Sequence, residues 1–338
     1  MPSFTVFKGH ESGAPKKQST TKPDELSGDQ VFVKITASGL CGTEALVLTR
    51  LQRHQHVGLG HEGVGIVEKT GPLCKVLKVG DRIGWGYNHN FCGHCEQCLT
   101  GNDTYCAERA FYGYKDLDQG SFGSHAVWRE IALFKLPDNI SDEDAAPLQC
   151  AGATVFNALH AYQTQPTETV GIMGVGGLGH LAIQFAAKMG CRVVVLSGSD
   201  SKKDEALALG AHEFVAMKGK TELEVSRPLD RLLVTTSFQP SWDQVLPIMA
   251  PRAVIYPLSV SSDNFEVPYM RMLENGITIQ FSVVASRIVH QRMLDFAAIH
   301  QIKPIIQLFD MTEEGILDAM EKLDQGKIHF RAVLKPVA

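Results

Sequence analysis

Residues 169–190 read TVGIMGVGGLGHLAIQFAAKMG, and this stretch decides the fold of the second half of the chain. Its apolar start, residues 170–173, predicts a buried parallel strand, and residues 178–189 have the spacing of an amphipathic helix. Between the two stands the run Gly174-Val175-Gly176-Gly177-Leu178-Gly179, a G-x-G-x-x-G pattern on a strand-to-helix turn. That placement predicts a βα unit that binds a dinucleotide.

Each glycine of this run has a separate physical role. Gly174 allows the tight turn, Gly176 lets the backbone approach a pyrophosphate, and Gly179 allows close packing of helix on strand. The N-terminus of the following helix offers free N–H groups and a positive dipole to the anion. The alternative is a glycine-rich turn that binds no ligand.

The sequence patterns differ between the two halves of the chain. After about residue 142 helical and strand patterns alternate, which predicts an α/β, doubly wound parallel sheet. Further strands are expected at residues 192–196, 231–235, 253–256 and 277–281. The first half instead shows short β-branched runs at 31–39, 64–71, 81–87 and 125–137, and it reads as β-rich. Helical spacing marks residues 142–162 and 313–323, and a last strand is expected at 330–336.

Composition limits the class of protein. At 338 residues two domains are expected, and an apolar fraction of 44% with 20% charged residues describes an ordinary globular protein. The formal charge of -5 argues against nucleic acid and anionic membranes as partners. The sequence has neither an apolar run of transmembrane length nor the apolar core of a signal peptide, so we expect a cytoplasmic protein with reduced thiols.

The end of the second strand addresses the choice of cofactor. An NAD site usually has Asp or Glu about 20 residues after the glycines, whereas this chain has Ser197. Ser197, Ser199 and Lys202 offer hydroxyl and ammonium groups that suit a 2′-phosphate, and they predict NADP(H). Asp200 is the residue that argues against it, and Lys202 and Lys203 could instead simply solvate the start of a helix.

Four cysteines lie in the run FCGHCEQCLTGNDTYC. Cys92, Cys95, Cys98 and Cys106 have the spacing C-x2-C-x2-C-x7-C, which can close a tetrahedral zinc site with no open position. Ferredoxin-type clusters use a shorter last gap, and disulfides are disfavoured at this spacing without a secretory context. A structural zinc is therefore expected, with an unmetallated or redox-active cluster as the alternative.

A second set consists of Cys41, His61 and Cys150. Two thiolates, one imidazole and a vacant position would make a catalytic zinc site, but spacing does not prove that these distant residues meet. Cys41 and Cys150 could equally be small buried hydrophobes, the role expected for Cys74 and Cys191.

The blocks GLCGTE, LGHEGVG, CGHCEQC, LQCAGATV and GVGGLGHLAIQFAAKMG resemble the zinc-dependent medium-chain alcohol dehydrogenases. The similarity is greatest to the NADP(H)-dependent cinnamyl-alcohol-dehydrogenase-like subgroup. It implies a GroES-like β-barrel catalytic domain at 1–153 and 289–338 and a Rossmann NADP-binding domain at 154–288. It also implies two zinc ions per chain, the catalytic one held by Cys41, His61 and Cys150.

The resemblance assigns further roles. Glu62 would be a neighbouring or alternate ligand of the zinc, and Thr43 the hydroxyl that touches both the substrate oxygen and the cofactor ribose. Thr154 and Arg331 match positions that face the cofactor. The implied reaction is hydride transfer between NADP(H) and a primary alcohol or aldehyde, with zinc as the Lewis acid. A homodimer is expected.

Three residues depart from the family pattern. Glu44 stands where Asp is usual, and Leu46 replaces a histidine that relays protons to solvent. The ribose hydroxyl, water, or one of His54 and His56 could take over that relay. Phe281 replaces a usual glycine and should narrow the nicotinamide pocket or alter a subunit contact.

Two other functions compete with this one. Loss of the relay histidine would suit a reductase of an iminium or conjugated double bond, although Cys41, His61 and Cys150 favour carbonyl chemistry. The second is a non-catalytic zinc- and nucleotide-binding sensor or scaffold.

Overall fold

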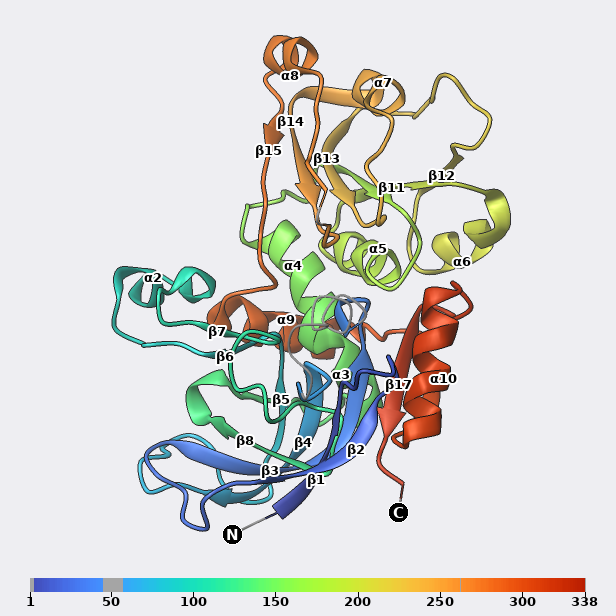
Figure 1. Cartoon of the computed structure of the whole chain (residues 1–338). Coiled ribbons are helices and arrows are strands. Elements are labelled where there is room, and N and C mark those ends of the chain that lie inside the picture. Colours follow the sequence, from blue (N-terminus) through green and yellow to red (C-terminus); the bar gives the residue numbers. More distant parts are fainter. Residues whose placement is uncertain (1–2, 45–56, 262, 338) are drawn as a thin grey trace. The chain divides into compact units, whose positions relative to one another are not determined.

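The computed structural model describes residues 3–44, 57–261 and 263–337 (Figure 1). The chain divides into two compact units. Unit 1 comprises Met1–Ala151, Ser286–Ala298 and Pro304–Ala338, and unit 2 comprises Gly152–Ala285 and Ile299–Lys303. The domain limits at 153/154 and 288/289 stay a prediction, because a division into compact units does not measure which parts fold independently.

Unit 2 is built on a six-stranded parallel sheet with the order β12-β11-β10-β13-β14-β15. In chain order this is 3-2-1-4-5-6, the order of a dinucleotide-binding doubly wound sheet, so the expected fold of this half is confirmed. The strands are β10 (Thr169–Met173), β11 (Arg192–Ser197), β12 (Glu213–Ala216), β13 (Leu229–Val234), β14 (Met249–Pro257) and β15 (Thr278–Ile279). The helices are α4 (Ala153–His160), α5 (Gly179–Lys188), α6 (Lys203–Ala208), α7 (Trp242–Val245) and α8 (Tyr269–Asn275).

The sheet forms where the sequence is continuously apolar. All five residues of β10 are buried, as expected for a central parallel strand covered on both faces. Helix α5 buries Leu181, Ile183 and Phe185, and each such side chain contributes about 1.5–3 kcal/mol. The strand expected at 277–281 is shorter than predicted, because β15 lies at the edge and pairs with β14 alone among the described strands.

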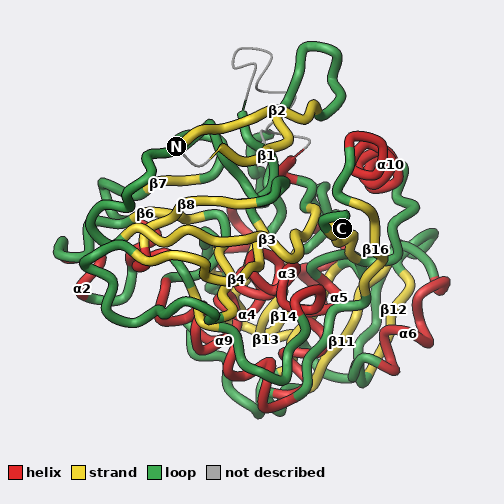
Figure 2. The backbone as a smooth tube through the Cα atoms, turned by 90° about the horizontal axis from the view of Figure 1, so that it is seen from below, coloured by secondary structure: helices red, strands yellow, loops and turns green. Residues whose placement is uncertain are grey.

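Unit 1 contains a seven-stranded, mainly antiparallel sheet with the order β16-β17-β3-β4-β5-β9, in which β8 also pairs with β3. Its strands are β3 (Gln30–Leu40), β4 (Glu62–Thr70), β5 (Arg82–Trp85), β8 (His125–Arg129), β9 (Phe134–Lys135), β16 (Ile306–Asp310) and β17 (Arg331–Lys335). Figure 2 shows β3, β4 and β8 running side by side. Two small sheets pair β1 (Ser3–Lys8) with β2 (Lys16–Thr21) and β6 (Asn88–Asn90) with β7 (Ala110–Phe111).

The helices of unit 1 are α2 (Glu96–Leu99), α3 (Asp142–Pro147), α9 (Arg287–His300), whose last two residues belong to unit 2, and α10 (Glu313–Asp324). Helix α10 confirms the helix expected at 313–323, and Thr312 caps it by accepting a hydrogen bond from Gly315 N. It lies beside β17 (Figure 1).

Two expected segments are interrupted. Residues 125–137 split into β8, a short 3-10 turn and β9. The helical stretch 142–162 passes through a π-helical segment, Leu148–Gly152, immediately after Pro147. Pi-helical turns of this kind are frequent at functional sites. Within the part of the chain that the structure describes, no helix combines the length and hydropathy needed to cross a bilayer.

Candidate active site

Strand pairing brings two of the expected metal ligands together. Cys41 follows β3 directly and His61 precedes β4, and these antiparallel strands pair Gly39 with Glu62. Cys150 comes from the π-helical segment. One ligand atom from each of Cys41, His61, Glu62 and Cys150 lies within 4.8 Å of all the others. Residues more than 100 positions apart therefore form one cluster, and all of them belong to unit 1.

The His61 imidazole is oriented for a ligand. Its Nδ1 lies 2.7 Å from Glu44 Oε1, and the ring is 1% exposed. Its Nε2 is buried and has no hydrogen-bond partner among the described residues. A buried polar atom of this kind is costly unless something binds it. Two thiols and an imidazole nitrogen with a free lone pair are the donor set that zinc prefers, so the residues present fit the ion.

Without an ion, the charges of the cluster are shared between Cys41 and His61. The neighbouring Cys150 thiol and His61 hold the pKa of Cys41 well below its usual value. Burial alone would lower the pKa of His61, but Glu44 and Cys41 raise it well above its usual value overall. The Cys41 thiol raises the pKa of Cys150, and burial raises the pKa of Glu44, so the Cys41 thiolate beside the His61 imidazolium is the main charge pair. Zinc binding at Nε2 would displace the proton of that imidazolium.

Glu62 forms a buried ion pair with Arg331. Its Oε2 accepts a hydrogen bond from Arg331 Nη2, while its Oε1 has no partner among the described residues. Burial raises the pKa of Glu62, and the guanidinium opposes that rise. A Cβ at Gly39 would lie 1.9 Å from Glu62 Oε2, so any larger residue there would displace the Glu62 carboxylate from its place beside Arg331. The cofactor contact expected for Arg331 stays a prediction, because the partner that the structure gives this guanidinium is Glu62.

Thr43 lies at the same cluster, with its Oγ1 3.4 Å from Cys41 Sγ. Glu44 also accepts a hydrogen bond from Cys41 N at 3.0 Å, so one carboxylate contacts two of the expected ligand residues. The relay position Leu46 and the substitutes His54 and His56 lie outside the described residues.

Aromatic side chains surround His61. The Tyr87 ring centroid is 5.6 Å from that of His61, and the Tyr112 centroid is 4.8 Å away. Phe111 packs against Tyr87 at 5.2 Å. Nothing in the sequence singled out Tyr112.

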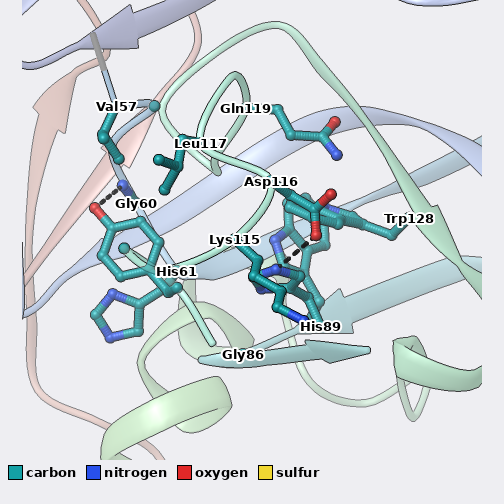
Figure 3. Close-up of a pocket in the computed structure, with 14 residues that line it drawn as sticks. Val57, Gly60, His61, Gly86, His89, Lys115, Asp116, Leu117, Gln119 and Trp128 are labelled. Atoms are coloured by element: carbon teal, nitrogen blue, oxygen red, sulfur yellow. Dashed lines mark hydrogen bonds and ion pairs between the residues drawn. The ribbon is translucent and has the colours of Figure 1, made fainter. Parts of the chain in front are cut away.

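Figure 3 shows a small pocket of unit 1 that has His61 in its wall. His89 and Asp116 lie elsewhere in the same wall, with His89 Nε2 2.9 Å from Asp116 Oδ2.

The four-cysteine run folds into a closed cluster. The ligand atoms of Cys92, Cys95, Cys98 and Cys106 lie within 4.8 Å of one another. Backbone N–H groups of Cys92 and Cys95 point at sulfurs of the same cluster, at 3.5 and 3.3 Å. Such bonds stabilise thiolates, and backbone donors lower the pKa of Cys92 to about 6. All eight cysteines are free thiols in the structure.

The glycine run has the geometry that its pattern predicts. Gly174 has a φ of 93°, and its N–H bonds Leu196 O at 2.8 Å. A Cβ at Gly179 would lie 1.9 Å from Gly174 O, whereas one at Gly176 would meet nothing within 4 Å. The turn is therefore tight where the helix packs, and open at Gly176 where a pyrophosphate would approach.

Lys202 reaches this loop. Its Nζ donates to Val175 O at 2.8 Å, so the side chain extends from the end of β11 to the glycine run. Ser199 Oγ lies 2.9 Å from Ser201 Oγ, and Ser197 ends β11. Because Lys202 contacts the loop expected to hold the cofactor, simple solvation does not describe it. The neighbouring Lys203 is exposed.

Two other expected positions lie in unit 2. Thr154 is buried in the first turn of α4. Phe281 is 54% exposed, with its ring 5.5 Å from that of Phe265. The effects expected of Thr154 on the cofactor and of Phe281 on the pocket stay predictions.

The chain matches known proteins over nearly its whole length. Residues 27–138 match the family model described as alcohol dehydrogenase GroES-like domain, and residues 177–298 match zinc-binding dehydrogenase. An alcohol dehydrogenase of Geobacillus stearothermophilus is 32% identical over 92% of this chain and 93% of its own. Aldehyde reductase AdhA of Synechocystis is 30% identical over 92% of this chain and 93% of its own.

A solved structure agrees with these matches. The cinnamyl alcohol dehydrogenase of Sorghum bicolor superimposes with a TM-score of 0.89 at 28% identity, covering 99% of this chain and 98% of that one. The matches favour alcohol and aldehyde chemistry over iminium or double-bond reduction and over a non-catalytic role.

Proposed function

Because the chain belongs to the zinc-binding alcohol dehydrogenase family, with its GroES-like fold and Rossmann-type parallel sheet, we propose that it is an NADP(H)-dependent enzyme with two zinc ions. It is an alcohol dehydrogenase or aldehyde reductase. The zinc, the choice of NADP(H) and the roles of individual residues are the content of the proposal.

One observation supports the proposed catalytic centre most directly. The buried Nε2 of His61 has no hydrogen-bond partner among the described residues, and a ligand nitrogen of His61 lies within 4.8 Å of the sulfurs of Cys41 and Cys150. These three residues would hold the catalytic ion. When bound there, Zn2+ supplies a Lewis acid that polarises a carbonyl and lowers the pKa of an alcohol.

The chain's own groups then have distinct tasks. Glu44 holds the His61 ring in the tautomer that leaves Nε2 free to bind. Thr43 presents a hydroxyl beside Cys41, where it would move the proton between the substrate oxygen and the cofactor ribose. The Glu62–Arg331 pair places a second carboxylate beside the cluster and balances its charge.

The cofactor would bind at the glycine run. Gly176 leaves room for the pyrophosphate, and the N-terminus of α5 offers N–H groups to it. Ser197 and Ser199 carry hydroxyls, and Lys202 carries an ammonium that is already positioned at Val175. A 2′-phosphate would be attracted to this set, whereas an NAD site has a carboxylate at its place.

Cys92, Cys95, Cys98 and Cys106 would hold the second zinc, with a structural role, since four thiolates leave no position for substrate. Tyr87 places an aromatic ring close to His61, and Phe111 packs against Tyr87. These rings favour aldehydes with an apolar or planar body.

We further propose a cytoplasmic homodimer. The free thiols that both clusters require fit a reducing compartment. The edge strand β15 and the exposed side chains Phe281 and Leu273 offer a surface for a second copy of the chain.

A substrate panel tests the proposal. Purified enzyme is assayed with NADPH and with NADH against aromatic aldehydes, aliphatic aldehydes, enones and cyclic imines. We expect aldehyde reduction with NADPH well ahead of NADH. Reduction confined to enones or imines would overturn the carbonyl assignment, and equal use of NADH would overturn the cofactor assignment.

A further inference from the structure

The backbone N–H of Gly60, the residue before His61, donates its hydrogen bond to a side chain. Around it the chain is held by main-chain bonds: Leu59 N donates to Phe7 O at 2.9 Å, and Gly60 O accepts from Ser121 N at 2.9 Å. Gly60 N–H instead donates to the hydroxyl of Tyr112 at 3.1 Å. Figure 3 marks this bond as a dashed line at Gly60.

Gly60 has little freedom to rearrange. Its φ is 91°, a conformation that favours glycine, and a Cβ would lie 2.4 Å from Phe122 Cδ1. Gly60 is also buried, and Ser121 and Phe122 enclose the side on which a Cβ would lie. The Tyr112 hydroxyl is therefore the group that keeps this buried donor satisfied.

The ring of Tyr112 contacts the imidazole as well. The two ring centroids are 4.8 Å apart with an interplanar angle of 31°, and Tyr112 is 5% exposed. Tyr112 is itself anchored, because its N–H donates to Tyr87 O at 2.9 Å just after β7. One side chain thus contacts His61 from two directions, through the preceding backbone and through the ring.

We propose that Tyr112 is a positioning residue that holds His61 ready for the catalytic metal. Glu44 fixes one nitrogen of the ring, but a single hydrogen bond leaves the imidazole able to tilt about it. The packed ring and the Gly60 bond remove that tilt, so Nε2 stays directed at the sulfurs of Cys41 and Cys150. This inference rests on the proposed function and deepens it.

The test replaces Tyr112 with Phe, which keeps the ring and leaves Gly60 N–H unsatisfied. Metal release to a chelator and the visible absorption of Co2+-substituted protein are measured for both ions of each chain. We expect the ion at His61 to be released about 10- to 100-fold more readily, the range typical of lost supporting bonds around a metal ligand. The ion in the four-cysteine cluster should be unaffected, and the cobalt spectrum should change. Tyr114→Phe is the matched control, since Tyr114 lies on the same loop and is 66% exposed.

The outcomes separate the two proposals. If wild type binds an ion in the four-cysteine cluster only, the proposed catalytic centre fails and this inference fails with it. If wild type binds two and Tyr112→Phe releases them as wild type does, with an unchanged cobalt spectrum, only the role of Tyr112 is overturned. Should the variant not fold, hydrogen exchange of the wild-type peptide around Gly60 gives the answer: protection of that amide in metal-free protein supports the contact, and fast exchange overturns it.

Discussion

Glu44 Oε1 lies 2.7 Å from His61 Nδ1, and both side chains are buried. The carboxylate therefore sets the tautomer of the ring and increases the basicity of Nε2. Glu44→Gln keeps the shape and removes the charge. We expect about 10- to 100-fold weaker binding of the catalytic zinc, read by competition with a chelator.

Glu44→Asp is the matched comparison, because it retains the charge and shortens the reach. It should bind zinc more tightly than Glu44→Gln. Zinc affinity that is the same in both variants and in wild type would show that Glu44 does not support the ligand.

Lys202 provides the test of cofactor choice. Lys202→Ala removes an ammonium whose charge-assisted bond to phosphate is worth about 1.5–3 kcal/mol, so KM for NADPH should rise about 10- to 100-fold. KM for NADH should change little. Lys203→Ala, at the exposed neighbouring lysine, should leave both unchanged. An equal loss with both cofactors would mean that Lys202 only braces the loop at Val175.

The closed cluster should contribute to stability. Cys98→Ser removes one of four thiolates around an expected ion, so we predict loss of one zinc per chain and a lower thermal midpoint. Cys74→Ser, at a cysteine outside both clusters, is the control. Retention of two zinc ions and of the wild-type midpoint in Cys98→Ser would contradict the structural role.

His290 makes stability depend on pH. Burial lowers its pKa to about 3, against about 6.5 in an unfolded chain, and its Nε2 lies 3.0 Å from Gln149 Oε1. Between pH 6.5 and pH 3 the His290 imidazole is protonated in the unfolded state but neutral in the folded state, so the free energy of unfolding falls as the pH falls. The contribution is complete above about pH 6.5, and roughly 2 kcal/mol should be lost by pH 5.

Urea unfolding at several pH values measures this effect. His290→Gln should show a shallower decline than wild type between pH 6.5 and 5, by about one bound proton. His329→Gln, at an exposed histidine, should decline as wild type does. Parallel curves for wild type and His290→Gln would contradict the assignment.

Much of unit 2 could be predicted from the sequence, because its signals are local. The glycine run marks a strand, a turn and a helix within some twenty residues, and the structure has all three at β10 and α5. The predicted strand at 277–281 was too long, since an edge strand is set by its neighbours rather than by its own propensity.

The candidate active site could not be derived from spacing. Cys41, His61 and Cys150 meet because β3 pairs with β4 and because a π-helical segment carries Cys150, and neither feature has a sequence signal. Resemblance to the family supplied that grouping. The role of Tyr112 could not be predicted from the sequence, because its hydroxyl binds the backbone N–H of Gly60 and a backbone contact leaves no pattern of side chains in the sequence.

The most direct test of the central claim is the zinc content of wild type and of His61→Ala, measured together with NADPH-dependent aldehyde reduction by the same samples. We predict two zinc ions per chain and activity in wild type, and one zinc ion and no detectable reduction in His61→Ala, with the ion of the four-cysteine cluster retained. Full activity in His61→Ala, or in wild type stripped of zinc, would contradict a reaction centred on Cys41, His61 and Cys150.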